Sequence, residues 1–218
     1  MLSLISKIIA PHSCIFCNTE GRTVCDGCFS QHITLRTQAC VWCNRLDDTG
    51  RTCRSCRRHT PLLRLTTLLR LDEASERLIY ALKYHGNREI ATLLGRRLAQ
   101  QIPDGVELIT FVSSDGPALR RRGYNQAELI ARAVSDELGV PIRPTLLRLR
   151  HAPQVGQSRH RRIEQTKGNF MIRSGALAGR RICIIDDVVT TGATLSECAR
   201  VLKAAGARSV SAAALARK

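Results

Sequence analysis

Aromatic and acidic side chains are both scarce in this chain of 218 residues. Phe, Trp and Tyr together make up 4% of the sequence, which argues against a broad surface for stacking nucleobases. The chain has 18 Asp and Glu against 34 Lys and Arg, a formal net charge of +16 that favours partners rich in phosphate. Hydrophobic residues at 44% still suffice for a globular core, which excludes a disordered basic tail.

The sequence also lacks a long apolar run. The most apolar N-terminal stretch, residues 2–10, is interrupted by Lys7 and is too short to span about 30 Å of hydrocarbon. No basic region precedes it and a cysteine cluster follows at once, so it does not have the pattern of a signal peptide. We therefore expect no membrane insertion and a cytoplasmic location, where clustered cysteines bind metal more often than they form disulfides.

Eight of the ten cysteines lie within the first 56 residues as four CxxC pairs: Cys14/Cys17, Cys25/Cys28, Cys40/Cys43 and Cys53/Cys56. Two residues between ligands let one tight turn aim both thiolates at a single ion, and tetrahedral zinc takes four thiolates at about 2.3 Å. Eight cysteines at four per ion therefore predict two closed Zn2+ sites. Because a closed site has no open position for water, the metal is structural and contributes folding energy to a segment too short for its own core.

Two pairing orders are open for these sites. Consecutive pairing joins Cys14, Cys17, Cys25 and Cys28 in one site and Cys40, Cys43, Cys53 and Cys56 in the other, whereas cross-brace pairing alternates the pairs. The short gaps inside each half favour consecutive pairing, because neighbouring turns need little loop closure. A redox or disulfide framework is the competing interpretation, which the expected reducing compartment disfavours. The remaining Cys183 and Cys198 are expected to be small core residues.

The periodicity changes after the cysteine-rich segment. Strand-like runs occur at 66–71, 106–112, 181–185 and 209–215, and the run at 181–185 is apolar on both faces. Helical spacing occurs within 74–102, with a break at 85–87, and again at 125–138 and 194–205, with Asn125 as an expected N-cap. Strands that alternate with helices predict an α/β domain, a parallel sheet with helices on both faces. Ligands of such sheets bind at the carboxyl ends of the strands.

The most informative string is ICIIDDVVTTGAT at 182–194. A buried strand delivers two adjacent acids, Asp186 and Asp187, and a loop with two Thr and a Gly then opens a helix. Backbone N–H groups at a helix N-terminus bind anions, and paired carboxylates suit vicinal hydroxyls or a hydrated Mg2+. The string therefore predicts a sugar-phosphate site. No GxxxxGKS/T sequence is present, which disfavours a P-loop nucleotidase.

At these residues the chain resembles the ComF family, competence and DNA-utilization proteins within the type I phosphoribosyltransferase superfamily. The resemblance covers nearly the full length and rests on the cysteine-rich start and on the strings ALKYHG at 81–86, RGYNQ at 122–126 and DDVVTTGAT at 186–194. It implies a double zinc ribbon, residues 1–60, before a parallel-sheet phosphoribosyltransferase-like domain, residues 61–218. It also implies binding of phosphoribosyl pyrophosphate (PRPP) with Mg2+, and displacement of pyrophosphate by a nitrogen nucleophile.

The resemblance also assigns residues to the parts of PRPP. Asp186 and Asp187 would meet the ribose hydroxyls, and the 5'-phosphate would lie against Val189, Thr190, Thr191, Gly192, Ala193 and Thr194. A pyrophosphate loop would occupy 113–117, with Ser113, Ser114 and Arg122, and a mobile loop within 148–168 would contribute Gln154 and Arg162. Two positions depart from the family pattern: Ser113 stands where the family has Pro, and Gln165 where it has Asn. No residue is identified as a general base.

Positive charge concentrates at 120–122 and at 143–167, and the second stretch has seven Lys and Arg against one acid. PRPP, single-stranded DNA and plain solvation of a basic face each account for it. The leading hypothesis is a ComF-type protein that binds PRPP and Mg2+, transfers the ribosyl group and works in DNA uptake or utilization. The alternative is a non-catalytic DNA-binding competence factor whose PRPP site is regulatory or vestigial. Other competence or DNA-processing proteins are further candidate partners.

Overall fold

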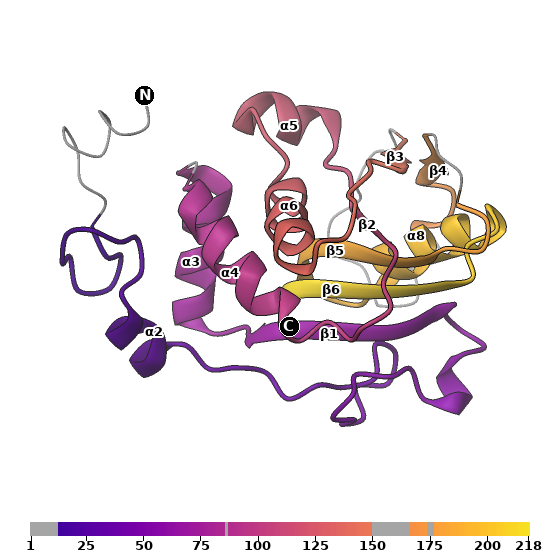
Figure 1. Ribbon diagram of the computed structural model, residues 1–218, viewed down its shortest axis with the longest axis horizontal. Helices are drawn as coiled ribbons and strands as arrows, with labels where there is room; N and C mark the ends of the chain where they lie inside the picture. Colours follow the sequence, from indigo (N-terminus) through magenta and orange to yellow (C-terminus); the bar gives the residue numbers. More distant parts are fainter. Residues whose placement is uncertain (1–12, 86, 150–165, 174–176) are drawn as a thin grey trace.

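The computed structural model describes residues 13–85, 87–149, 166–173 and 177–218. Helices and a parallel sheet form most of it (Figure 1). In chain order the elements are α2 (Asp26–His32), the 3-10 helix η1 (Arg54–Cys56), β1 (Leu62–Arg70), α3 (Glu73–Tyr84), α4 (Arg88–Ala99), β2 (Leu108–Phe111), α5 (Gly116–Arg122), α6 (Gln126–Leu138), β3 (Leu146–Arg148), β4 (Phe170–Ile172), β5 (Arg181–Val189), α8 (Ala193–Ala204) and β6 (Ser209–Arg217). Among these described helices none is long and apolar enough to cross a bilayer.

Four strands form the main sheet in the order β1-β6-β5-β2, and every neighbouring pair is parallel. β2 ends at Phe111, opposite Ile185, whereas β5 continues beside β6 as far as Val189. The sheet therefore has a step at its carboxyl edge, where the last residues of β5 have β6 on one side and no β2 on the other. A separate antiparallel pair, β3 and β4, lies beside the main sheet.

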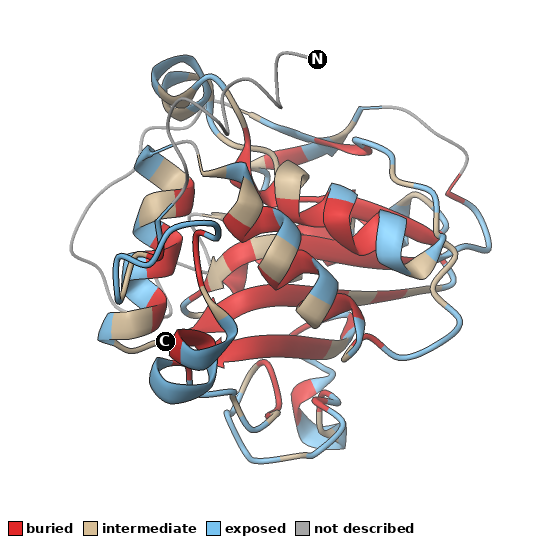
Figure 2. Ribbon diagram, turned by 60° about the vertical axis from the view of Figure 1, so that its left-hand side comes forward, coloured by how far each residue is buried: buried red, intermediate tan, exposed pale blue. Residues whose placement is uncertain are grey.

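The side chains of β5 alternate between two apolar cores. Cys183 and Ile185 belong to the core beneath α3, α4 and α6, and Ile182 and Ile184 belong to the core beneath α8. Because successive side chains of a strand point to opposite faces, both faces of the sheet are covered by helices. Figure 2 shows the result as a continuous buried band along the central strands.

The cysteine-rich segment continues the sheet at its β1 edge. Backbone N–H groups of Arg36 and Arg70 donate to Leu68 and Thr34, and those of Thr52 and Leu65 donate to Leu63 and Gly50. The Gln38 side chain accepts from the Thr67 N–H at 2.9 Å and donates to the Thr67 carbonyl at 2.8 Å. These contacts pair backbone groups that an edge strand would otherwise leave open.

The predicted α/β class with an N-terminal cysteine module is confirmed, and so is Asn125 as the N-cap of α6. Several bounds differ. β1 begins at Leu62 rather than at residue 66, and β5 runs through both acids to Val189 because β6 remains available as a partner. Helices α2 and α5 and the β3–β4 pair were not predicted. Cys183 and Cys198 are fully buried, as expected of core residues.

Candidate functional site

The two acids of β5 lie at the step in the sheet edge. Asp186 is opposite Ala214 of β6, and β2 has already ended at the level of the preceding residue. Asp186 borders two neighbouring hollows, one lined by the end of β2 and by α5 and α6, the other formed by Asp186 itself and residues 188–195. The strand thus places one carboxyl group between two cavities.

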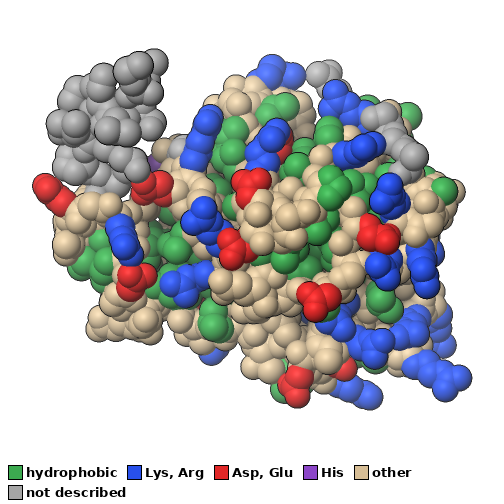
Figure 3. Space-filling model, viewed as in Figure 1, with side chains coloured by type: hydrophobic (Ala, Val, Ile, Leu, Met, Phe, Trp, Pro, Cys, Tyr) green, Lys and Arg blue, Asp and Glu red, His purple; other side chains and the backbone are tan. Residues whose placement is uncertain are grey.

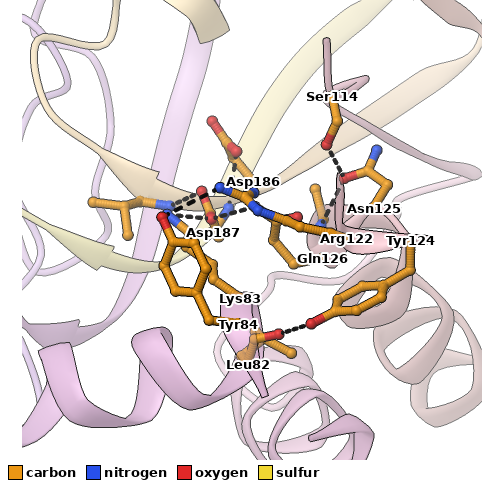
Figure 4. A network of polar contacts seen from close by, with 12 residues as sticks. Leu82, Lys83, Tyr84, Ser114, Arg122, Tyr124, Asn125, Gln126, Asp186 and Asp187 are labelled. Carbon is orange, nitrogen blue, oxygen red and sulfur yellow. Dashed lines mark hydrogen bonds and ion pairs between the residues drawn. The ribbon is translucent and has the colours of Figure 1, made fainter. Parts of the chain in front are cut away.

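Asp187 is held by side chains from two helices (Figure 4). Lys83 of α3 places its Nζ 2.7 Å from Asp187 Oδ2, and the Gln126 Nε2 of α6 donates to the same oxygen at 3.2 Å. The second oxygen, Oδ1, accepts from the Val188 N–H at 2.7 Å. With the residue only 8% exposed, these contacts fix the carboxylate in one orientation.

Asp186 is in a different electrostatic state. Burial raises the pKa of its carboxyl well above the usual range, and the neighbouring Asp187 carboxylate raises this pKa further. One oxygen accepts the Asp187 N–H at 2.9 Å. One of the two adjacent acids is paired with a lysine and the other is poorly solvated. Hydroxyl donors or a cation bound at this site would stabilise the charged carboxylates.

The hollow on one side of Asp186 is a phosphate-sized loop, residues 188–195, with a volume of about 40 Å³. Gly192 is the N-cap of the twelve-residue helix α8 and has φ +77°, a conformation that side chains disfavour. Because Gly192 has no side chain, the N-cap residue caps none of the first N–H groups of α8, of which the Ala193 N–H donates to Thr191 Oγ1 at 3.3 Å. Together with the hydroxyls of Thr190, Thr191 and Thr194, they form a donor set suited to an anion.

The hollow on the other side is a cleft of about 180 Å³ lined by Ser113, Ser114, Arg122 and Arg148 as well as the two acids. The Ser114 hydroxyl donates to Asn125 Oδ1 at 3.0 Å, and Asn125 Nδ2 donates to the Val112 carbonyl at 3.0 Å. The N-cap of α6 therefore also fixes the loop that follows β2. The predicted loop 113–117 is shorter than expected, because Asp115 caps α5 and the helix begins at Gly116.

Most of the predicted site residues with described positions come together here. Asp186, Asp187, Ser113, Ser114 and Arg122 share the cleft, and residues 189–194 form the adjoining loop. Gln154 and Arg162 lie outside the described residues. Sequence reasoning missed Lys83, Gln126 and Arg148 as members of the site. The first two belong to the strings that carry the resemblance, which was the available signal for them.

Aromatic side chains beside the cleft extend the site across α3. Tyr84 is 53% exposed, and the Arg122 guanidinium lies over its ring at 5.1 Å from the centroid. Tyr80, 57% exposed, stands 4.7 Å from the Tyr84 ring, centroid to centroid. The Tyr124 hydroxyl donates to the Leu82 carbonyl and so ties α3 to the turn that starts α6.

The eight cysteines gather into two groups of consecutive pairs, with all four sulfurs of a group within 4.8 Å of one another. We call them the first cluster (Cys14, Cys17, Cys25, Cys28) and the second cluster (Cys40, Cys43, Cys53, Cys56). Cys17 and Cys25 have sulfurs 3.8 Å apart, and Cys53 lies 3.8 and 3.7 Å from Cys40 and Cys43. A tetrahedron with zinc–sulfur bonds of about 2.3 Å has edges of about 3.8 Å, so both clusters fit zinc.

The two clusters start with the same turn. In each, the Asn after the second cysteine has φ 60° and donates its N–H to the carbonyl of the first cysteine, at 2.8 Å for Asn18 and 3.1 Å for Asn44. Asn tolerates this left-handed conformation better than most residues. Trp42 lies inside the second turn and stacks on His59, with 4.8 Å between the ring centroids.

Comparisons with known proteins agree with this geometry. Residues 125–218 match the phosphoribosyl transferase domain family. Over 199 residues the chain is 27% identical to competence protein ComFC of Bacillus subtilis, covering 86% of this chain and 81% of that one. It is 32% identical over 160 residues to DNA utilization protein YhgH of Escherichia coli O157:H7, covering 69% and 70%. Competence protein F of Haemophilus influenzae is 35% identical over 101 residues, 44% of each chain.

Fold, acid pair and cysteine clusters thus define a phosphoribosyltransferase-like protein with an N-terminal zinc-ribbon-type module. The chain is 32% identical to the E. coli relative and covers 70% of its length, which identifies the family within this class. The chain belongs to the ComF family.

Proposed function

We propose that this protein binds PRPP together with Mg2+ and transfers its ribosyl group to a nitrogen nucleophile. One observation carries the proposal: Asp186 stands between a small loop of backbone N–H and Thr hydroxyl donors and a basic cleft. PRPP has the matching shape, because its ribose ring lies between a 5'-phosphate and a pyrophosphate.

The residues divide the ligand between them in this proposal. Thr190, Thr191, Thr194 and the N–H groups that begin α8 bind the 5'-phosphate, and Asp186 and Asp187 accept from the ribose hydroxyls. Ser113, Ser114 and Arg122 face the pyrophosphate, for which an Arg fork is well suited. Lys83 and Gln126 orient Asp187 through contacts of 2.7 and 3.2 Å and so act as positioning residues.

In the transfer step the bond between the anomeric carbon and the pyrophosphate oxygen breaks, and pyrophosphate leaves with the electron pair. The nitrogen forms the new bond to that carbon, and its proton is released to solvent. Bound Mg2+ would offset the charge of the departing pyrophosphate. The chain's own contribution is to hold the ribose between two fixed anion sites, which places the anomeric carbon for attack.

Calorimetric titration of the zinc-loaded protein with PRPP and Mg2+ tests the binding. We expect saturable binding by the wild type and a loss of at least about tenfold in Asp186→Asn, because a carboxylate that accepts from a hydroxyl is worth about 1.5–3 kcal/mol. The matched control is Asp136→Asn, an exposed acid of α6 outside the cleft. Absence of wild-type binding, or equal affinity in the two variants, would contradict the proposal.

A second candidate function is binding of single-stranded DNA. The favouring observation is the exposed pair Tyr80 and Tyr84 with Arg122 over one ring, a combination that suits unpaired bases and their phosphates. On the face of the molecule drawn in Figure 3, Lys and Arg side chains are widely spread, with fewer acids between them. The names of the relatives, competence and DNA utilization proteins, agree with this role, which we place in the cytoplasm alongside other DNA-processing proteins.

A titration with a short single-stranded oligonucleotide at two salt concentrations tests this candidate. We expect affinity to fall steeply as salt rises and to weaken in Tyr84→Leu, which removes a stacking ring worth about 1–3 kcal/mol per base. Leu119→Ala, at an exposed apolar residue of α5, is the control for general surface changes. No binding at low salt would exclude this function and leave the PRPP proposal intact.

A further inference from the structure

The second cluster touches the loop that we assign to phosphate. Val41 lies between Cys40 and Cys43, is 1% exposed, and shares an apolar core with Val189 and Leu195, which flank the loop. A β-carbon built on Gly192 would lie 3.0 Å from Val41 Cγ2 and 3.5 Å from the Val41 carbonyl oxygen. The turn of the second cluster therefore packs directly on the backbone of Gly192.

Arg217 clamps this turn to the sheet. It is the last residue of β6, is 4% exposed, and donates to the carbonyls of Cys40 at 3.0 Å and Val41 at 2.9 Å. In the sheet Arg217 is the register partner of Val189, the residue from which the loop departs. One guanidinium thus joins the second cluster to the strand end that carries the loop.

A third contact reaches the helix that follows the loop. The buried Thr60, close after the last cysteine of the second cluster, has its hydroxyl 2.8 Å from that of Ser196 in the first turns of α8. The second cluster and the residues next to it therefore contact the loop at three places. These are the strand end at Val189, Gly192 in the middle of the loop, and Ser196 in the helix that follows. Each contact involves a buried group, so movement of the cluster cannot leave the loop unaffected.

The first cluster packs on a different part of the molecule. The Thr23 hydroxyl donates to Glu89 of α4 at 2.6 Å, and Arg77 of α3 donates to the Ile15 carbonyl at 2.6 Å. Val24, next to Cys25, is 5% exposed and belongs to the core beneath α3, α4 and α6. The chain thus contains a matched pair of valines, one in each cluster, of which only Val41 packs against Gly192.

We propose that the second cluster is a structural wall of the phosphate loop, with Val41 and Arg217 as positioning residues, so that metal loading of this cluster and anion binding at 190–194 are coupled. The eight thiolates fit zinc by their spacing, and a loaded cluster fixes the turn that presses on Gly192. Coupling of this kind is reciprocal: whatever stabilises the loop in its binding shape also strengthens metal retention by the second cluster. The identity of the anion rests on the function proposed above, whereas the mechanical coupling does not.

Amide hydrogen exchange of the full chain, without ligand, tests the coupling directly. In Val41→Ala we expect the amides of residues 191–195 to exchange at least about fivefold faster than in wild type, because the loop opens more often. Val24→Ala removes the same two methyl groups from the first cluster and should leave these amides unchanged. Arg217→Lys, which keeps the charge and loses the fork geometry, should act like Val41→Ala and guards against a single misfolded variant.

Calorimetry with PRPP and Mg2+ on the same proteins gives the ligand readout. We expect Val41→Ala and Arg217→Lys to bind several-fold more weakly than wild type, and Val24→Ala to bind equally. Equal loop exchange in Val41→Ala and Val24→Ala would overturn the coupling, whatever the ligand does. If wild type fails to bind PRPP while Val41→Ala still speeds loop exchange, the coupling stands and the assigned ligand is wrong.

Discussion

The two cysteine clusters start from nearly the same sequence and the same turn, yet they meet different partners. The first cluster rests against α3 and α4, through Thr23, Val24 and the stacking of Arg97 over Phe29 at 3.9 Å. The second cluster adds its backbone to β1 and packs against the loop at 190–194. The CxxC turn that both clusters share therefore determines how the cysteines are arranged around a metal ion. It does not determine which part of the fold the turn packs against.

The difference has a simple origin in the chain's path. Residues 34–38 run along β1 between the two clusters, with Leu35 paired antiparallel to Leu69. This segment lies beside the last residues of β1, at the carboxyl edge of the sheet, and leads directly into the second cluster, which meets the loop that follows β5. The position of the second cluster is thus determined by the path of the linker and not by any property of the cysteines.

Loss of one metal site should produce the largest difference between the clusters. Cys17 and Cys43 are both exposed second cysteines of their turns. We expect Cys17→Ser and Cys43→Ser each to lose one of two zinc ions by metal analysis. We expect Cys43→Ser to lower the free energy of unfolding by about 4 kcal/mol or more and Cys17→Ser by about half as much, since structural zinc supplies folding energy.

Both clusters contribute a buried valine to a core, but the second cluster also pairs its backbone with β1 and accepts two hydrogen bonds from the buried Arg217, which is the reason for the inequality. Urea unfolding followed by circular dichroism measures both values, with the wild type titrated with a chelator as reference. Equal destabilisation by the two substitutions would remove the distinction drawn between the clusters.

Glycine substitutions should give a smaller difference of the same sign. Gly21 of the first cluster has φ +106° and open space within 4 Å of the place where an added β-carbon would lie, whereas at Gly50 that carbon would lie 2.3 Å from the Leu65 carbonyl oxygen. We expect Gly21→Ala to cost about 1 kcal/mol from backbone strain alone, and Gly50→Ala about 3 kcal/mol because the junction with β1 must shift. Thermal unfolding checks both, and a Gly21→Ala cost as large as that of Gly50→Ala would contradict the second cluster's tighter junction.

The sequence predicted the elements whose signal is local. The string at 182–194 contained an apolar strand, two acids and a glycine before a helix, and these are β5, the acid pair and the N-cap of α8. CxxC spacing likewise indicated the two groups of cysteines. Where the fold depends on a distant partner, the predictions were incomplete: β5 passes through Asp186 and Asp187 because β6 offers a matching run of alanines beside it.

The contacts that complete the site also depend on residues that are distant in the sequence. Lys83 lies on the helix α3, where a lysine is expected to face solvent, and only the packing of α3 against the sheet brings it to Asp187. Val41 and Gly192 are far apart in the chain, and β3 pairs with β4 across a long intervening stretch. Non-local pairing of this sort leaves no periodic pattern, so the resemblance of the motifs was the available guide to it.

The smallest expected effect concerns the acids beside the loop that the second cluster supports. Burial and the Asp187 carboxylate raise the pKa of Asp186, so its charged form is disfavoured in the folded protein. An acid with a raised folded pKa costs stability progressively as the pH rises above its unfolded pKa of about 3.9. Asp186→Asn should therefore stabilise the protein at pH 7 by about 1 kcal/mol, and by less near pH 4.

Unfolding measured at both pH values decides this, with Asp136→Asn as the exposed control that should change stability at neither. The expected gain is paired with the loss of PRPP binding, since the group that is unfavourable to bury is the one assigned to the ribose. The first cluster packs on α3 and α4 instead, through Thr23 and Ile15. If Asp186→Asn stabilises the protein equally at pH 4 and pH 7, the charge of Asp186 does not lower the free energy of unfolding. The result would then contradict the view that the second cluster supports an electrostatically unfavourable site.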